Sequence, residues 1–162
     1  MILVALGANL PSPAGAPAVT LRAALDELAR CGAVPAATSQ FFVTAAWPDT
    51  GEPPFVNAVA RIETRLEPNA LLQLLHRIED KFGRRRGAPN ASRTLDLDLI
   101  DYHGRVEEGP PRLPHPRMDG RGFVLLPLAE VAPQWRHPVS GRMVAELIAA
   151  LPAAEREITI AK

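Results

Sequence analysis

The chain has 162 residues, of which 47% are hydrophobic and 22% are charged. This size and composition predict one compact domain over residues 1–162, with roughly the last ten residues as a loosely packed tail, and leave no need for disulfides or structural metal. Eighteen basic residues balance eighteen acidic ones, so no overall field draws the chain to nucleic acid or to a membrane surface.

The cysteine and histidine content bears on disulfides, on zinc binding and on the cellular compartment. Cys31 is the single cysteine, which excludes an internal disulfide, and four histidines without paired cysteines argue against a zinc framework. The apolar start at residues 1–7 lacks a basic region before it and is typical of a buried strand, not a signal peptide. No apolar run approaches the roughly 20 residues that span a bilayer. We expect a cytoplasmic monomer.

Hydrophobic periodicity predicts the secondary structure in chain order. Strands are expected at residues 2–6, 37–45, 55–62 and 95–102, with a short return strand after His103-Gly104. Helices are expected from Leu21 to Leu28 and from Leu71 to Phe82, and short helices at 123–131 and 143–151. A loop is expected at 48–51 and an irregular loop at 110–116. The order β-α-β-β-α-β predicts an α+β fold with a ferredoxin-like split βαβ core, a mainly antiparallel sheet with helices packed on it.

Two aspartates stand two residues apart in the strand predicted at 95–102. Leu95, Leu97 and Leu99 alternate with Asp96 and Asp98, so the carboxylates share one face. Two hard oxygen donors at this spacing suit Mg²⁺, including the paired ions of phosphoryl-transfer sites. The alternative is the solvated face of an antiparallel sheet.

Arginines precede this strand. Arg84, Arg85 and Arg86 follow the second long helix, and Arg93 comes directly before the aspartates, with Gly87, Pro89 and Asn90 between them. Guanidinium groups bind phosphate oxygens in pairs, and a flexible loop lets them close over a polyphosphate after it binds. The alternative for Arg84 to Arg86 is a solvated helix end, which leaves Arg93 unexplained.

Further polar and aromatic residues have two interpretations each. His115 lies between two prolines with Arg121 downstream, and its imidazole either donates to a phosphate oxygen or holds a loop. Asn57 offers an amide that both donates and accepts, as recognition of a heterocycle requires, while Phe55 or Phe123 offers a ring for stacking. As isolated residues these also fit core and edge positions, and Glu79 fits a helix surface.

Six segments together resemble one enzyme family. They are Gly7-Ala8-Asn9-Leu10, Phe55-Val56-Asn57, Ile78-Glu79 followed by Gly83-Arg84, Arg93-Thr94-Leu95-Asp96-Leu97-Asp98, Pro114-His115-Pro116-Arg117 and Arg121-Gly122-Phe123-Val124-Leu125. In this order, from Leu3 to about Leu151, the chain resembles 6-hydroxymethyl-7,8-dihydropterin pyrophosphokinase of folate biosynthesis.

The resemblance implies transfer of the β,γ-pyrophosphoryl group of ATP to the pterin hydroxymethyl group, with release of AMP. It implies two Mg²⁺ ions held by Asp96 and Asp98, with ATP as co-substrate. Catalytic positions would be Arg84, Arg93, Asp96 and Asp98. Nucleotide contacts would come from Glu79, Arg84, Arg86, Arg93, His115 and Arg121. Thr44, Phe55, Asn57 and Phe123 would line the pterin pocket. Charge neutralisation supplies most of the catalysis in such transfers, and no general base is identifiable.

Two alternatives use the same residues differently. A metal-dependent phosphohydrolase would use the Asp96 and Asp98 pair for hydrolysis, and a non-catalytic ferredoxin-like ligand-binding module would carry the aspartates as a solvated face. Where many members of the resembled family have a tryptophan in the loop before Arg93, this chain has Pro89-Asn90-Ala91-Ser92.

Overall fold

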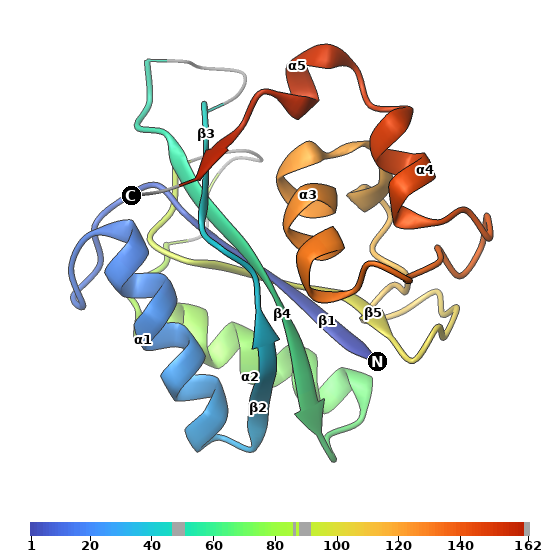
Figure 1. The fold of residues 1–162 in the computed structure, drawn as a ribbon. Coiled ribbons are helices and arrows are strands. Elements are labelled where there is room, and N and C mark those ends of the chain that lie inside the picture. Colours follow the sequence, from blue (N-terminus) through green and yellow to red (C-terminus); the bar gives the residue numbers. More distant parts are fainter. Residues whose placement is uncertain (47–50, 86, 88–91, 161–162) are drawn as a thin grey trace.

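The computed structural model describes residues 1–46, 51–85, 87 and 92–160. It has an α+β fold in which helices cover both faces of an antiparallel sheet (Figure 1). The strands are β1 (Ile2–Ala8), β2 (Ala33–Thr38), β3 (Phe42–Thr44), β4 (Phe55–Thr64), β5 (Asp96–Tyr102) and β6 (Thr159–Ile160). The helices are α1 (Pro17–Arg30), α2 (Pro68–Lys81), the 3₁₀ turn η1 (Met118–Gly120), α3 (Gly122–Val131), α4 (Val144–Ala149) and α5 (Ala153–Arg156).

The apolar strand β1 lies inside the sheet, next to the edge strand β5. It pairs with β4 on one side and β5 on the other, both antiparallel. The strand order is β5-β1-β4-β3-β6, and β2 also pairs with β4. Because β1 is covered on both faces, nearly all of it is buried. The expected α+β fold with an antiparallel sheet is therefore confirmed.

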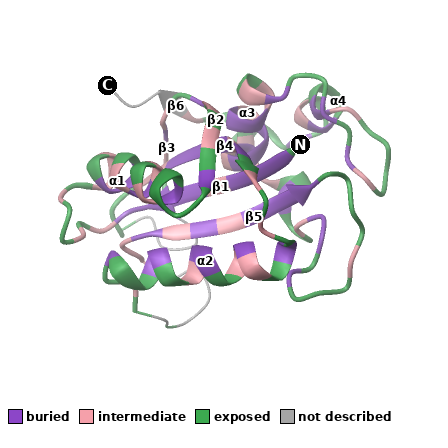
Figure 2. Ribbon diagram, turned by 90° about the horizontal axis from the view of Figure 1, so that it is seen from below, coloured by how far each residue is buried: buried purple, intermediate pink, exposed green. Residues whose placement is uncertain are grey.

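The two faces of the sheet contact different sets of helices. Leu95, Leu97 and Leu99 pack in the core beneath α1 and α2, while Ile100 packs in a second core with α3 and α4. The predicted alternation along β5 is thus correct. Helix α2 turns its buried residues towards the sheet (Figure 2). Leu75 is fully buried there, and truncating such a leucine to alanine typically costs about 2–5 kcal/mol.

The single strand predicted at 37–45 is wrong, because the segment forms the end of β2 and then β3. Residues 39–41 separate them, and Ser39 is the first of these. Its backbone N–H donates to the Val59 carbonyl at 2.9 Å, and its Oγ accepts the Val59 N–H at 3.0 Å. Ser39 thus binds both backbone polar groups of Val59. Pairing with β4 resumes at Phe42, which stands opposite Asn57.

Three other expectations differ from the structure or lie beyond it. No return strand follows His103 within the described residues, which show an isolated bridge between Glu107 and Leu113. Pro110 and Pro111 lie between these two and lack the N–H donors that a ladder needs. The expected tail contains α5 and β6. Most of the loop expected at 48–51 lies outside the described residues. Among the residues that the structure describes, no helix is long and apolar enough to cross a membrane.

Candidate active site

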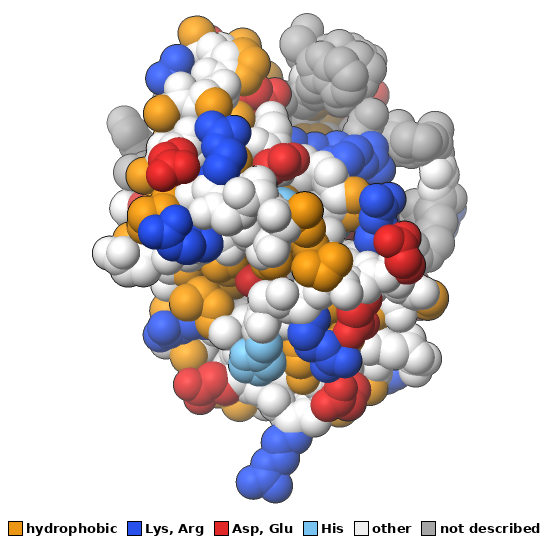
Figure 3. All heavy atoms as spheres, turned by 90° about the vertical axis from the view of Figure 1, so that its right-hand side faces the viewer, with side chains coloured by type: hydrophobic (Ala, Val, Ile, Leu, Met, Phe, Trp, Pro, Cys, Tyr) orange, Lys and Arg blue, Asp and Glu red, His pale blue; other side chains and the backbone are white. Residues whose placement is uncertain are grey.

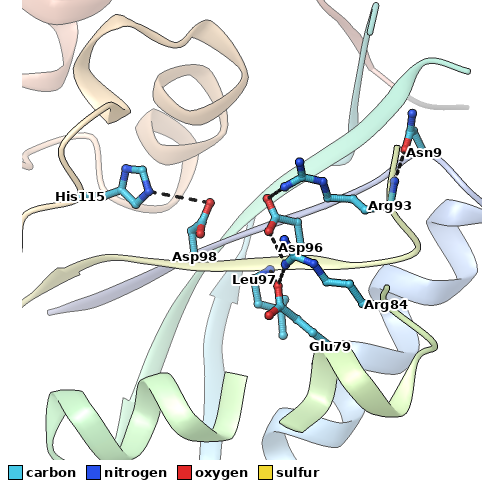
Figure 4. A network of polar contacts seen from close by, with 8 residues as sticks. All are labelled: Asn9, Glu79, Arg84, Arg93, Asp96, Leu97, Asp98 and His115. Carbon is cyan, nitrogen blue, oxygen red and sulfur yellow. Dashed lines mark hydrogen bonds and ion pairs between the residues drawn. The ribbon is translucent and has the colours of Figure 1, made fainter. Parts of the chain in front are cut away.

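The two aspartates lie on β5, on the sheet face opposite α1 and α2 (Figure 4). In the sheet register, Gly7 of β1 stands between Asp96 on β5 and Asn57 on β4, and Ala5 stands between Asp98 and Val59. Residues paired across strands share a face, with about 4.8 Å between neighbouring strands. Asp96 and Asn57 therefore point to the same side, about 10 Å apart at the backbone, across Gly7.

Gly7 keeps the middle of this row free of a side chain. A Cβ atom on Gly7 would lie 2.8 Å from Oδ1 of Asn57, closer than nonbonded atoms approach. Asn57 is itself 5% exposed, and its Nδ2 donates to Oγ1 of Thr44 at 2.9 Å. Thr44 stands opposite Phe55 in the β3–β4 register. Three of the residues expected at a pterin pocket, Thr44, Phe55 and Asn57, are thus brought together.

Both carboxylate oxygens of Asp96 are paired with arginine. Oδ1 accepts from Nη1 of Arg84 at 2.7 Å, and Oδ2 lies 3.0 Å from Nη1 of Arg93. The two arginines come from opposite ends of the loop between α2 and β5 (Figure 4). Side-chain exposure is 15% for Arg84 and 24% for Asp96, so these ion pairs are partly shielded from solvent and are stronger than surface pairs.

Glu79 anchors the same cluster from below. It is 1% exposed on the last turn of α2, and its Oε2 accepts the Leu97 N–H at 3.0 Å and a guanidinium N–H of Arg84. Leu97 lies between the two aspartates, so Glu79 fixes the backbone that carries them. The structure therefore places Glu79 beneath the strand and not on the helix surface.

Asp98 is the more accessible carboxylate, with a side chain 39% exposed. Burial raises its pKa to about 6, and the negative charge of Asp96 acts in the same direction. The charges of Arg84, Arg93 and Arg121 lower the pKa but do not offset the other two effects. A cation placed between the two carboxylates would remove this repulsion and favour the ionised form.

His115 faces Asp98 from the loop before η1. Its backbone N–H donates to the Ile100 carbonyl at 2.9 Å, which holds the loop on β5. Nε2 lies 4.0 Å from Oδ2 of Asp98, too far for a hydrogen bond. Burial lowers the pKa of His115, with the charges of Arg121 and Arg117 adding to the effect. Nδ1 accepts the Arg117 N–H at 3.3 Å, which assigns the proton of the neutral ring to Nε2.

Arg121 and Phe123 flank the first residue of α3. Arg121 is the N-cap residue, and its guanidinium carbon lies 5.4 Å from the centroid of the Phe123 ring, within the range of a cation–π contact. Helix α3 contacts both β3 and β4, the strands of Thr44 and Asn57. Arg86 and residues 88–91 of the expected loop, by contrast, lie outside the described residues and are among those coloured grey in Figure 3.

Asn9, which belongs to the first of the six resembling segments, is a residue to which the sequence interpretation gave no role. It is 2% exposed, and its Oδ1 accepts the Arg93 N–H at 2.8 Å. Its Nδ2 donates to the Pro53 carbonyl and to Oγ of Ser92, both at 3.0 Å. One side chain therefore joins the loop before β4 to the start of the aspartate segment. The available signal was a polar amide directly after a buried apolar strand.

The donor set fits one class of metal. Within the described residues, no group of three or more histidine, cysteine, aspartate or glutamate side chains is placed to hold an ion. Two carboxylates match the way Mg²⁺ is commonly held, in which one or two protein carboxylates are completed by substrate phosphates and water.

Comparison with known proteins finds matches over most of the chain. The family model described as 7,8-dihydro-6-hydroxymethylpterin-pyrophosphokinase (HPPK) matches residues 3–133. A Pseudomonas aeruginosa protein named 2-amino-4-hydroxy-6-hydroxymethyldihydropteridine pyrophosphokinase is 39% identical over 153 residues, covering 93% of this chain and 91% of its own. Its namesake from Haemophilus influenzae is 37% identical over 146 residues, covering 90% and 89%. The namesake from Synechocystis is 47% identical over 98 residues, 60% of this chain and half of that relative.

Proposed function

Because the chain belongs to the 7,8-dihydro-6-hydroxymethylpterin-pyrophosphokinase family, we propose that it transfers the β,γ-pyrophosphoryl group of ATP to 6-hydroxymethyl-7,8-dihydropterin in folate biosynthesis. The hydroxymethyl oxygen attacks the β-phosphorus of ATP and loses its proton to solvent, and the bond from that phosphorus to the oxygen of the α-phosphate breaks. AMP leaves. The observation that carries the proposal is the register row in which Asn57 and Asp96 share one face across Gly7.

Asp96 and Asp98 are the proposed ligands of two Mg²⁺ ions. The bound ions would neutralise the phosphate charge and orient the reacting groups. Asp98 is open to solvent on one side, which leaves room for an incoming cation and its water ligands. The oxygens of Asp96 are paired with Arg84 and Arg93, so a cation at Asp96 would take the place of a guanidinium.

The displaced guanidinium groups are proposed to bind the phosphates. An arginine that leaves Asp96 would carry its charge to an adjacent phosphate, whose oxygens it can bind with two N–H groups. Arg84 is retained near the strand by Glu79, and Arg93 by the Asn9 contact to its backbone. Arg84 and Arg86 are proposed to lie on a loop that closes after ATP binds. Glu79 is assigned a positioning role beneath the strand.

The remaining polar groups complete the phosphate site. Neutral His115 donates its Nε2 proton to a phosphate oxygen, since its low pKa keeps the ring neutral near pH 7. Arg121 adds a full positive charge from the N-cap of α3. These two groups approach from the α3 side, opposite the loop that carries Arg84 and Arg93.

The pterin is proposed to bind over β3 and β4. Asn57 offers amide groups to the ring edge, held in place by its bond to Thr44. Phe55 and Phe123 supply aromatic surface for the ring faces. We also propose that the protein acts as a cytoplasmic monomer, where the exposed thiol of Cys31 stays reduced.

Product identification tests the function. The protein is incubated with ATP, Mg²⁺ and 6-hydroxymethyl-7,8-dihydropterin, and the nucleotides and pterins are separated by chromatography. AMP and pterin diphosphate in equal amounts are the expected products. Release of inorganic phosphate without pterin would instead identify a phosphohydrolase.

A binding measurement tests the non-catalytic alternative. Asp96→Ala is expected to weaken Mg²⁺-dependent nucleotide binding, because it removes a proposed metal ligand. Unchanged binding in that variant would show that the aspartate is only part of a solvated face.

A further inference from the structure

The C-terminal segment 153–160 connects the two elements on either side of the proposed pterin pocket. Helix α5 contacts α3, and β6 pairs with β3, with Ile160 opposite Phe42. Figure 1 shows the segment passing from α5, beside α3, to the free edge of β3. The family model ends at residue 133, so this segment lies beyond the part of the chain that the family match covers.

Glu155 caps α3 from outside the helix. The N-cap residue Arg121 makes no side-chain capping hydrogen bond. Instead, the Gly122 N–H donates to Oε2 of Glu155 at 3.0 Å. The first amides of a helix have no partner within the helix, and a carboxylate is favourable at that end. The C-terminal segment therefore supplies a cap that the helix itself lacks.

Gly122 allows a close approach of two backbones. A Cβ atom at position 122 would lie 1.6 Å from the Glu155 carbonyl oxygen and 2.7 Å from its carbonyl carbon. Because these are main-chain atoms, no side-chain rotation relieves the clash. The start of α3 is therefore in contact with the segment at a point where any side chain would separate them.

The two ends of this segment meet the proposed pterin residues. At one end, Gly122 stands between Arg121 and Phe123. At the other, β6 pairs with β3 up to the position before Thr44, and Thr44 bonds to Asn57. A displacement of the segment would thus move the α3 wall relative to the β3–β4 wall.

We propose that Glu155 is a positioning residue for the pterin, and that its contact with Gly122 fixes the spacing between Phe123 and the Thr44–Asn57 wall. This inference rests on the proposed function. Of the proposed nucleotide groups, Arg121 adjoins the contact, whereas Arg84, Arg93 and His115 make their described contacts away from the segment. Loss of the Glu155 contact should therefore affect the pterin more than the nucleotide.

The test compares Glu155→Ala with Glu155→Gln and with Glu157→Ala, the control that removes an exposed carboxylate from the same segment. Equilibrium dissociation constants are measured for MgATP alone, and for the pterin in the presence of Mg²⁺ and a non-hydrolysable ATP analogue. Glu155→Ala should weaken pterin binding about fivefold, which corresponds to about 1 kcal/mol of binding free energy. MgATP binding should stay within about twofold.

The other variants separate positioning from general stability. Glu155→Gln keeps an oxygen that accepts the Gly122 N–H and should recover most of the pterin affinity. Gly122→Ala should weaken pterin binding in the same selective way, and it serves as the second test if Glu155→Ala does not fold. Equal losses for pterin and MgATP, or a Glu155→Ala protein that behaves as Glu157→Ala does, would overturn the inference. If wild-type protein neither binds the pterin nor forms its diphosphate, the proposed function fails instead.

Discussion

Glu79 offers a sharp test of how the aspartate strand is held. Its carboxylate is buried and accepts from the Leu97 backbone and from Arg84. Glu79→Ala leaves the Leu97 N–H without this acceptor, and a buried donor without a partner costs about 1–3 kcal/mol. The same change removes one of the two carboxylates that Arg84 contacts. Breaking a buried pair typically costs about 3–5 kcal/mol, but Arg84 keeps Asp96, so the cost here is smaller.

Together these effects predict a loss of about 3 kcal/mol in the free energy of unfolding. For a protein of this size each kcal/mol lowers Tm by about 2–4 °C, so Glu79→Ala should melt about 6–12 °C below wild type. Glu79→Gln keeps an acceptor for Leu97 and should lose about half as much. Differential scanning calorimetry gives both values, and Asp80→Asn, on the exposed neighbour, is the matched control.

The measurement also decides between two roles for Glu79. A positioning role predicts that stability and kcat fall together, because the strand that carries the aspartates loses its anchor. A Glu79→Ala protein with wild-type Tm and a raised dissociation constant for ATP would refute this reasoning. It would show instead the direct nucleotide contact that the family resemblance implies.

Three further predictions concern the metal and loop contacts. Asp98→Asn should lower the chemical rate in single-turnover experiments by orders of magnitude. The same variant should raise Tm at pH 7.5, because an acid whose pKa is raised in the folded protein destabilises the fold when it is ionised. A pKa raised by about two units corresponds nominally to about 3 kcal/mol, which the solvent exposure of Asp98 reduces to about 1 kcal/mol. Calorimetry should find the gain in Tm above about pH 6 but not below about pH 3.8. The Mg²⁺ concentration for half-maximal activity should rise about tenfold per pH unit below pH 6, and equal values at pH 5.5 and 7.5 would contradict the Asp98 assignment. Asn9→Ala should lower kcat/KM about tenfold or more through misplacement of Arg93 in steady-state assays, whereas a fall in Tm with unchanged kinetics would assign Asn9 a purely structural role.

Sequence periodicity predicted the long elements whose side chains alternate regularly between two different environments. The alternation along 95–100 is such a case, because one face of β5 packs against α2 and the other carries the aspartates. It failed at 37–45, where Ser39 replaces ladder pairing with a side-chain contact to Val59. The Ser39 hydroxyl interrupts the strand without changing the β-propensity of the residues on either side. Propensity therefore did not reveal the break. The strand β6 has two residues, too few for any periodic signal.

The site was predictable where chemistry is encoded in adjacent residues and not where it depends on contacts between distant ones. The spacing of Asp96 and Asp98 predicted a shared face, and the structure brings Arg84 and Arg93 to them. The burial of Glu79 depends on the packing of α2 against β5, which a helix pattern does not reveal. The Asn9 contacts join residues more than 80 positions apart, so only the fold discloses them.

Because arginines pair with both Asp96 oxygens, the site should bind weakly any anion that brings no cation with it. A phosphate-bearing inhibitor without a cation would draw the guanidinium groups away and expose Asp96 and Asp98 to each other. One that brings divalent ions restores the balance of charge as it binds. Anionic inhibitors of this protein should therefore be ranked at a defined free Mg²⁺ concentration, and those that chelate the ion into the site should rank highest.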